Sequence, residues 1–246
     1  MKQPISILPA IALRGTTILP DMIVHFDVSR ERSMKAIEAA MLQDEKIFLV
    51  TQKDPEMETP GITGSFCSLS NCLRFLKELK KYPVDIYVFI SDQVNSCDTR
   101  FFKANQLIIE VEKIIEKKVI CSVVEAEIFG PQIPLDLMVV YPCSANTLAK
   151  MAHGINDNAV TMAVKSTLRN QHNIVLGLCS NDLLSTSGMN MMKIFNTKHF
   201  YLVPMYQDDV IKKPNSLIAR RDLIIQTMIN ALVDKQIQPL FLMKKE

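Results

Sequence analysis

The sequence lacks tryptophan and any cysteine spacing typical of a zinc site. None of its six cysteines forms a C-x-x-C pair, and the four histidines show no metal-ligand spacing. Structural zinc needs closely spaced thiolate or imidazole ligands, so we expect no metal site. The expected state of the cysteines is reduced thiols, as in cytosolic proteins. These cysteines are Cys67, Cys72, Cys97, Cys121, Cys143 and Cys179.

The motifs of several enzyme classes are also missing. The chain has no G-x-x-x-x-G-K-[ST] loop, no G-x-S-x-G elbow and no G-x-G-x-x-G fingerprint after a strand. We find no signal-like segment and no apolar run near the ~18 residues that cross a bilayer. A net charge of +2 gives no reason to expect nucleic acid or an anionic membrane as partner. A cytoplasmic protein without membrane contact is therefore expected.

What the sequence does contain is a regular alternation of strand-like and helix-like segments from residue 61 onward. This alternation predicts an α/β fold with a mostly parallel sheet, whose ligand site lies at the carboxyl ends of the strands. With 246 residues, 48% of them hydrophobic, the chain can bury a full core. The expected strands are 84–90, 137–141, 174–179 and 199–204, and the expected helices are 71–80, 106–117, 158–169, 189–197 and 217–234.

The first 60 residues follow a different pattern. Strand-like segments at 5–13, 23–28 and 47–50 surround a predicted helix at 30–43. Residues 51–60 are polar, contain two prolines and show no periodicity, so they are interpreted as a linker.

The segment Gly61-Ile62-Thr63-Gly64-Ser65, before a predicted helix, has a composition that suits a phosphate. Glycines allow close backbone approach, hydroxyls donate hydrogen bonds, and a helix N-terminus favours an anion. A plain tight turn explains the same residues.

A second polar segment, residues 142–147, directly follows the apolar run LMVVY. Its short side chains could hold a planar cofactor at the end of a strand. The alternative is that Ser144 simply caps a helix.

Three other segments have structural explanations as the default. Asn156-Asp157-Asn158 fits a turn and a helix cap. Residues 188–192 place methionines where they could pack the core or form a flexible clamp over the site. Residues 207–216 fit a solvated loop, with contact to an acidic substrate or a neighbouring subunit as the alternative. His153 fits a surface or capping histidine better than a general base.

In this order, the segments resemble the flavoprotein superfamily that includes flavin-dependent cysteine decarboxylases. Within it, VVEAEIFGPQIPLDLMVVYPCSANTLAKMAHGINDNAVTMAVKSTLRN and QDDVIKKPNSLIARRDLI are similar to the family of dipicolinate synthase B subunits. The resemblance covers residues 61–246 and implies a Rossmann-like three-layer fold that could hold FMN. It also implies a homo-oligomer that acts with a catalytic A subunit in the mother cell, oxidising a dihydrodipicolinate-type precursor to dipicolinate during sporulation.

The resemblance also assigns candidate site residues. It places the loop that begins at Gly61 beside the flavin phosphate, which Thr63, Gly64 and Ser65 would contact. Ser91 could also face this phosphate. The ring system would lie against Ser144, Ala145, Asn146 and Thr147, and the substrate clamp would be Met189 and Asn190.

One departure from the superfamily concerns catalysis. Residues 130–136 contain no histidine where the decarboxylases carry a catalytic one. Cysteine decarboxylation is therefore not expected, and the catalytic residue is unassigned. A non-catalytic assembly subunit with an empty flavin pocket is the alternative.

Residues 1–58 resemble the start of the N-terminal substrate-recognition domain of Lon protease, through ILPAIALRGTTILPDMIVHFDVSRERSMKAIEAAMLQDEKIFLVTQKD. Nothing of the Lon ATPase or its protease is present, so proteolysis is not expected. The resemblance predicts a short β/α appendage at 1–58 and a flavoprotein domain at 59–246. A further hypothesis is that the appendage binds apolar polypeptide.

Because Pro60 cannot donate to a β-ladder, we also expect that the family's first strand is lost at this junction. Residues 47–50 are the candidate substitute for it in the sheet.

Overall fold

The computed structural model describes residues 10–14, 31–41, 48–52, 57–65 and 68–243. The chain divides into two compact units, residues 1–55 and 56–246. In the first unit, β1 (Ala10–Arg14) and β2 (Phe48–Gln52) pair in parallel, with α1 (Glu31–Met41) between them in the chain. The predicted strand at 23–28 lies outside the described residues.

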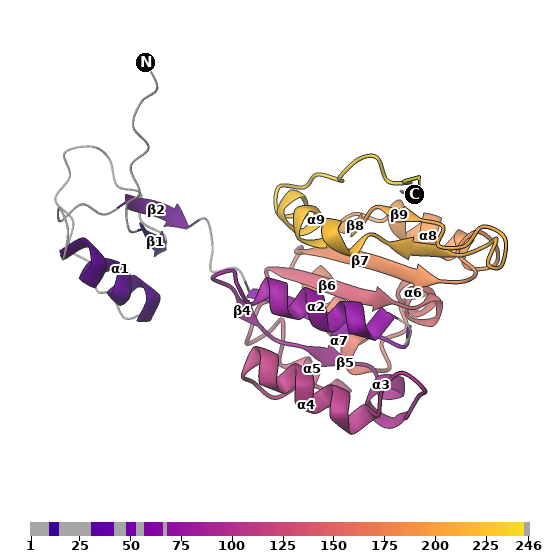
Figure 1. Ribbon diagram of the computed structural model, residues 1–246, viewed down its shortest axis with the longest axis horizontal. Coiled ribbons are helices and arrows are strands. Elements are labelled where there is room, and N and C mark those ends of the chain that lie inside the picture. Colours follow the sequence, from indigo (N-terminus) through magenta and orange to yellow (C-terminus); the bar gives the residue numbers. More distant parts are fainter. Residues whose placement is uncertain (1–9, 15–30, 42–47, 53–56, 66–67, 244–246) are drawn as a thin grey trace, which may run out of the picture. The chain divides into compact units, whose positions relative to one another are not determined.

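The second unit is built on one eight-stranded sheet (Figure 1). Its hydrogen-bonded order is β4-β3-β6-β7-β10-β9, with β5 also paired to β3 and β8 also paired to β7. All pairs among β3 to β8 are parallel, whereas β10 is antiparallel to both of its neighbours. The strands are β3 (Met57–Ile62), β4 (Asp85–Ile86), β5 (Phe89–Ile90), β6 (Leu137–Cys143), β7 (Asn173–Ser180), β8 (Phe200–Leu202), β9 (Met205–Tyr206) and β10 (Leu217–Ala219).

Helices cover both faces of this sheet, because the buried strands are apolar on both sides. On one face of β6, Val139 packs in a cluster with residues of α2, α4 and α9. On the other face, Met138 and Val140 pack with residues of α5, α6, α7 and α8. This arrangement confirms the predicted three-layer α/β fold with a mostly parallel sheet. The helices are α2 (Leu69–Leu79), α3 (Asp92–Ser96), α4 (Ala104–Ile115), α5 (Val123–Glu127), α6 (Ala145–Ala152), α7 (Ala159–Arg169), α8 (Gly188–Phe195) and α9 (Ile224–Ala231).

The expected loss of the first strand is wrong. β3 occupies the central position between β6 and the β4/β5 pair, so residues 57–60 belong to a strand and not to a linker. The proposed substitute, residues 47–50, is also wrong, since β2 pairs with β1 in a separate two-stranded sheet.

Pro60 fits this central strand because its missing N–H faces a gap in the ladder. Ile62 accepts a hydrogen bond from the Ser91 N–H at 3.1 Å, so its carbonyl points toward β5. Backbone groups two residues apart point the same way, and Pro60 therefore faces that side too. There the pairing stops after Glu58 with Ile86 and resumes at Gly61 with Phe89.

Two other predicted elements are corrected. The segment 84–90 forms two short strands, β4 and β5, and not one. The predicted helix 217–234 begins instead as β10, continues as a 3₁₀ turn at Arg221–Leu223, and becomes α9 at Ile224. β10 is held by pairing on both sides, Ile218 lying opposite both Cys179 and Tyr206. None of the described helices is long and apolar enough to cross a membrane.

Candidate functional site at the carboxyl edge of the sheet

Three predicted site segments meet at one edge, where β3, β5 and β6 end. Ile62 pairs with Ile90, and Gly61 pairs with Val140. The residues that follow these strand ends, Thr63, Ser91 and Ser144, therefore come from distant parts of the chain to one place. This edge is where parallel α/β sheets bind ligands.

Thr63 is fully buried, and its hydroxyl group is engaged on both sides. It donates a hydrogen bond to the Pro142 carbonyl at 2.7 Å and accepts one from the Ser144 N–H at 2.9 Å. The hydroxyl proton is thus used within the protein. The neighbouring Gly64 and Ser65 are only half-buried, so they lie closer to solvent than Thr63 does. A phosphate contact for this loop stays a prediction.

Gly61 lies within β3, one residue before its last position. A Cβ atom here would lie 2.8 Å from both the Met138 Cε and the Val160 Cγ1 atoms. Close packing between strand and helix therefore accounts for this glycine. Its predicted role at the cofactor stays a prediction.

Ser91 carries the most informative side chain at this edge. It is 5% exposed, and within the described part of the chain its Oγ is a buried side-chain atom without a hydrogen-bond partner. It is the N-cap residue of α3, yet its side chain makes no capping hydrogen bond. A buried hydroxyl left unpaired costs roughly 1–3 kcal/mol and calls for an explanation such as a ligand.

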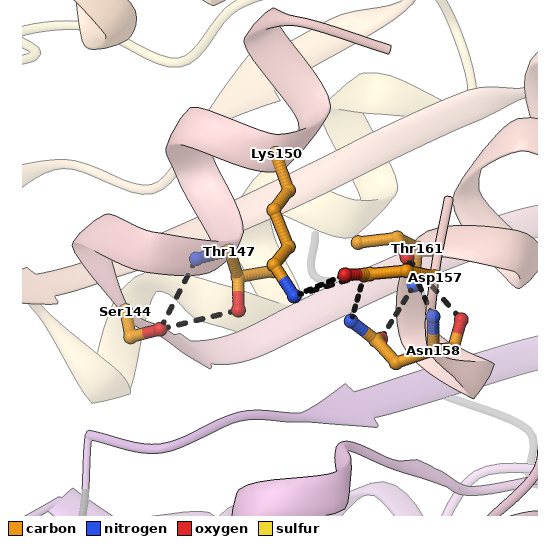
Figure 2. Close-up of polar contacts among 6 residues, drawn as sticks. All are labelled: Ser144, Thr147, Lys150, Asp157, Asn158 and Thr161. Atoms are coloured by element: carbon orange, nitrogen blue, oxygen red, sulfur yellow. Dashed lines mark hydrogen bonds and ion pairs between the residues drawn. The ribbon is translucent and has the colours of Figure 1, made fainter. Parts of the chain in front are cut away.

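The segment after β6 begins a helix, as the structural alternative predicted. Ser144 caps α6, its Oγ accepting a hydrogen bond from the Thr147 N–H at 3.3 Å and lying 3.1 Å from the Thr147 Oγ1 (Figure 2). Ala145 is half-buried and Asn146 is exposed. The cap does not exclude the predicted ring contact, which stays a prediction.

Helix α6 is tied to the start of α7 by the Lys150–Asp157 ion pair (Figure 2). Lys150 Nζ lies 2.8 Å from both carboxylate oxygens of Asp157. The hydrogen bond from Lys150 outweighs desolvation and holds the pKa of Asp157 below its usual range. Asn158 and Thr161 then form a capping box at the first turn of α7, which confirms the predicted turn and cap. Because Asp157 is exposed, the pair contributes only about 0–1 kcal/mol.

The predicted substrate clamp lies on α8. Met189 is 83% exposed and Asn190 is half-buried, so neither packs the core. The turn before α8 is fixed by Asp182, which accepts hydrogen bonds at 2.6 Å from the hydroxyls of Ser180 and Ser187. Burial opposes ionisation of Asp182, but these two hydrogen bonds outweigh it and hold its pKa below the usual range.

The Ser180–Asp182–Ser187 group was not predicted from the sequence. The available signal was a serine and an aspartate two residues apart, directly after a buried strand.

The remaining predicted residues lie on the surface or are bound within the fold. His153 lies exposed at the C-cap of α6. The 207–216 loop is held internally, with Asp208 bound to Lys213 and Ser216. Among the described residues, no group of three or more His, Cys, Asp and Glu side chains could hold a metal ion.

Comparisons with known proteins agree with this architecture. The Flavoprotein family model matches residues 36–228. The B subunit of dipicolinate synthase from Bacillus subtilis is 37% identical over 180 residues, which cover 73% of this chain and 90% of that protein. The crystal structure of the corresponding B subunit from Bacillus halodurans superposes with a TM-score of 0.70 at 35% identity, covering 76% of this chain and 96% of the other.

Two further similarities concern the fold and the N-terminal unit. The FMN-dependent cysteine decarboxylase SpaF has a TM-score of 0.56 at 17% identity, covering 72% of this chain and 97% of that one, which shows a shared fold. Lon protease of Clostridium acetobutylicum is 46% identical over 79 residues, 30% of this chain but only 10% of that protein. The resemblance stated for both parts of the sequence is confirmed. On the family match and the identity to the Bacillus subtilis protein together, the chain belongs to the Flavoprotein family.

Proposed function

We propose that this chain is the flavoprotein-type subunit of a dipicolinate synthase, supporting oxidation of a dihydrodipicolinate-type precursor to dipicolinate during sporulation. The observation that carries the proposal is the 37% identity to a dipicolinate synthase B subunit across 90% of that protein. The proposed location is the cytoplasm of the mother cell. The proposed partners are a catalytic A-type subunit and further copies of this chain.

The proposed cofactor is FMN, held at the carboxyl edge of the sheet. The buried and unpaired Ser91 Oγ supports this, because a phosphate oxygen would satisfy it once the side chain turns toward the site. Ser91 would hold the phosphate together with the half-buried Gly64 and Ser65. The ring system would lie against residues 144–147, and Met189 and Asn190 would contact substrate. When bound, FMN supplies an acceptor for the hydride that a dihydropyridine-type ring loses as it becomes aromatic.

The second candidate is an assembly subunit with an empty flavin pocket. Two observations favour it. Residues 130–136 contain no histidine, so this segment offers no imidazole base, and cysteine decarboxylation is not part of the proposal. The Thr63 hydroxyl also has its proton bound to Pro142 already. A polypeptide-binding role for the Lon-like segment is weaker, since it rests on similarity to 10% of a larger protein.

The test is reconstitution of dipicolinate formation from purified subunits. The A-type catalytic subunit is supplied with the dihydro precursor, with and without this chain and with and without added FMN, and dipicolinate is measured by its ultraviolet absorbance. We expect formation to depend on this chain and to rise with FMN. Dependence on the chain but not on FMN would favour the assembly role, and no dependence on the chain would overturn both candidates.

A further inference from the structure

The end of β6 departs from regular pairing where the site begins. Val140 pairs with Leu176, but the next pair joins Cys143 to Leu178. Three steps on β6 therefore correspond to two on β7, which is a β-bulge. Bulges bend a strand, re-aim the residues after it, and are common next to functional sites. Here the bulge directly precedes Ser144 and so sets the direction in which α6 starts.

Side chains from other elements satisfy the backbone groups of this bulge. The Cys72 thiol of α2 donates to the Tyr141 carbonyl at 3.3 Å. The Thr63 hydroxyl donates to the Pro142 carbonyl at 2.7 Å and accepts from the Ser144 N–H at 2.9 Å. Thr63 thus makes two of these three contacts. Its two partners, Pro142 and Ser144, lie 79 and 81 positions further along the chain.

These contacts form a continuous connection from one predicted half of the site to the other. Thr63 opens the Gly64–Ser65 loop at the end of β3. It binds the backbone on both sides of Cys143, and Ser144 in turn caps α6 through the Thr147 N–H. The hydroxyl therefore fixes how far the loop after β3 lies from the first turn of α6.

We propose that Thr63 is a positioning residue whose hydroxyl holds the β6 bulge, and that it acts on the cofactor through Ser144 and not by direct contact. The effect on the cofactor rests on the proposed function, whereas the effect on the bulge does not. Without the hydroxyl, the Pro142 carbonyl and the Ser144 N–H lose their partner, and residues 142–147 lose the anchor that aims them at the site. Because Pro142 is buried, water cannot replace that partner without local opening.

The variants are Thr63→Val, which keeps the shape but removes the hydroxyl, and Thr63→Ser, which keeps the hydroxyl. The matched control is Thr167→Val. Thr167 is equally buried, and its hydroxyl donates to the Ala163 carbonyl at 2.8 Å inside α7. Full-length proteins are compared by unfolding midpoint, by amide hydrogen exchange across residues 141–150, and by FMN titration followed through flavin fluorescence.

We expect Thr63→Val to speed exchange of the Ser144 and Thr147 N–H groups at least tenfold and to weaken FMN binding at least tenfold. Thr63→Ser should stay within about threefold of wild type in both. Thr167→Val should lower the unfolding midpoint but leave both readouts unchanged. Equal FMN affinity for Thr63→Val and wild type would overturn the proposal, as would equal loss in Thr63→Val and Thr167→Val.

A further measurement uses the wild-type protein alone and so does not depend on whether the variants fold. If the Ser144 N–H is held by Thr63, it should exchange at least tenfold more slowly than the Asn146 N–H in the same turn. Equal exchange at the two amides would overturn the proposal that the Thr63 hydroxyl holds the β6 bulge. If the wild-type protein fails to bind FMN while the Ser144 N–H is protected, the proposed cofactor is wrong but the positioning role of Thr63 is retained.

Discussion

Replacing Ser91 by alanine should stabilise the protein without ligand and weaken its binding of FMN. The two effects have one cause. The Ser91 Oγ is buried without a partner, and its side chain makes no cap to α3, so removing it breaks no hydrogen bond of the fold. A buried hydroxyl without a partner costs roughly 1–3 kcal/mol, and alanine removes that cost.

The expected gain in stability is that cost, reduced by the packing energy lost where the oxygen atom was. We expect the free energy of unfolding to rise by about 1 kcal/mol, or the melting temperature by about 2–4 °C for a domain of this size. A hydrogen bond to a charged phosphate contributes about 1.5–3 kcal/mol. Its loss should therefore weaken FMN binding about 10- to 100-fold.

The assay is urea unfolding of the ligand-free protein together with FMN titration. The matched control is Ser216→Ala. Ser216 is buried, as Ser91 is, but its hydroxyl donates to Asp208 at 2.7 Å. That substitution should destabilise the protein by about 1 kcal/mol and leave FMN affinity unchanged. A loss of stability in Ser91→Ala, or a gain in stability without weaker FMN binding, would contradict the role assigned to the Ser91 Oγ.

Three further predictions concern the strand and turn that support the site. Gly61→Ala should destabilise the fold by about 1–3 kcal/mol in urea unfolding, because its Cβ would lie 2.8 Å from two side-chain atoms; an unchanged midpoint would contradict this packing. Pro60→Ala should cost less than about 1 kcal/mol, since the residue faces the ladder gap, and a loss above about 2 kcal/mol would show otherwise. The folded-state pKa of Asp182 lies below the unfolded value of about 3.9, so its ionised form stabilises the fold above that pH and the contribution disappears as pH falls through the folded pKa. Asp182→Asn should therefore flatten the loss of unfolding free energy below about pH 4, and an unaltered pH profile would count against this role.

The sheet was predictable where strands are long and apolar. LMVVY and IVLGLC lie inside β6 and β7, because strands covered on both faces select continuous apolar runs. The segment METPGI gave no such signal. Its polar residues and proline argue against a strand, and pairing with β6 on one side and β4 and β5 on the other overrides that local preference.

The site was predictable in place but not in its contacts. Ser91 and residues 142–147 were expected after strands, and parallel strands bring such residues to one edge. The Gly61 loop was expected without its strand, so its place beside them could not be predicted. The partners of Thr63 lie 79 and 81 residues away, so no local pattern could reveal that its hydroxyl holds the β6 bulge. The unpaired state of Ser91 likewise depends on everything packed around it. β10 was missed because its three residues run directly into a helix-like pattern.

The most direct test of the central claim is the visible absorption spectrum of the purified protein after incubation with FMN and removal of excess flavin. We expect a bound flavin spectrum with about one FMN released per chain on denaturation, and a clearly lower yield for Ser91→Ala. A well-folded protein that remains colourless under these conditions would contradict the claim that this edge of the sheet holds a flavin.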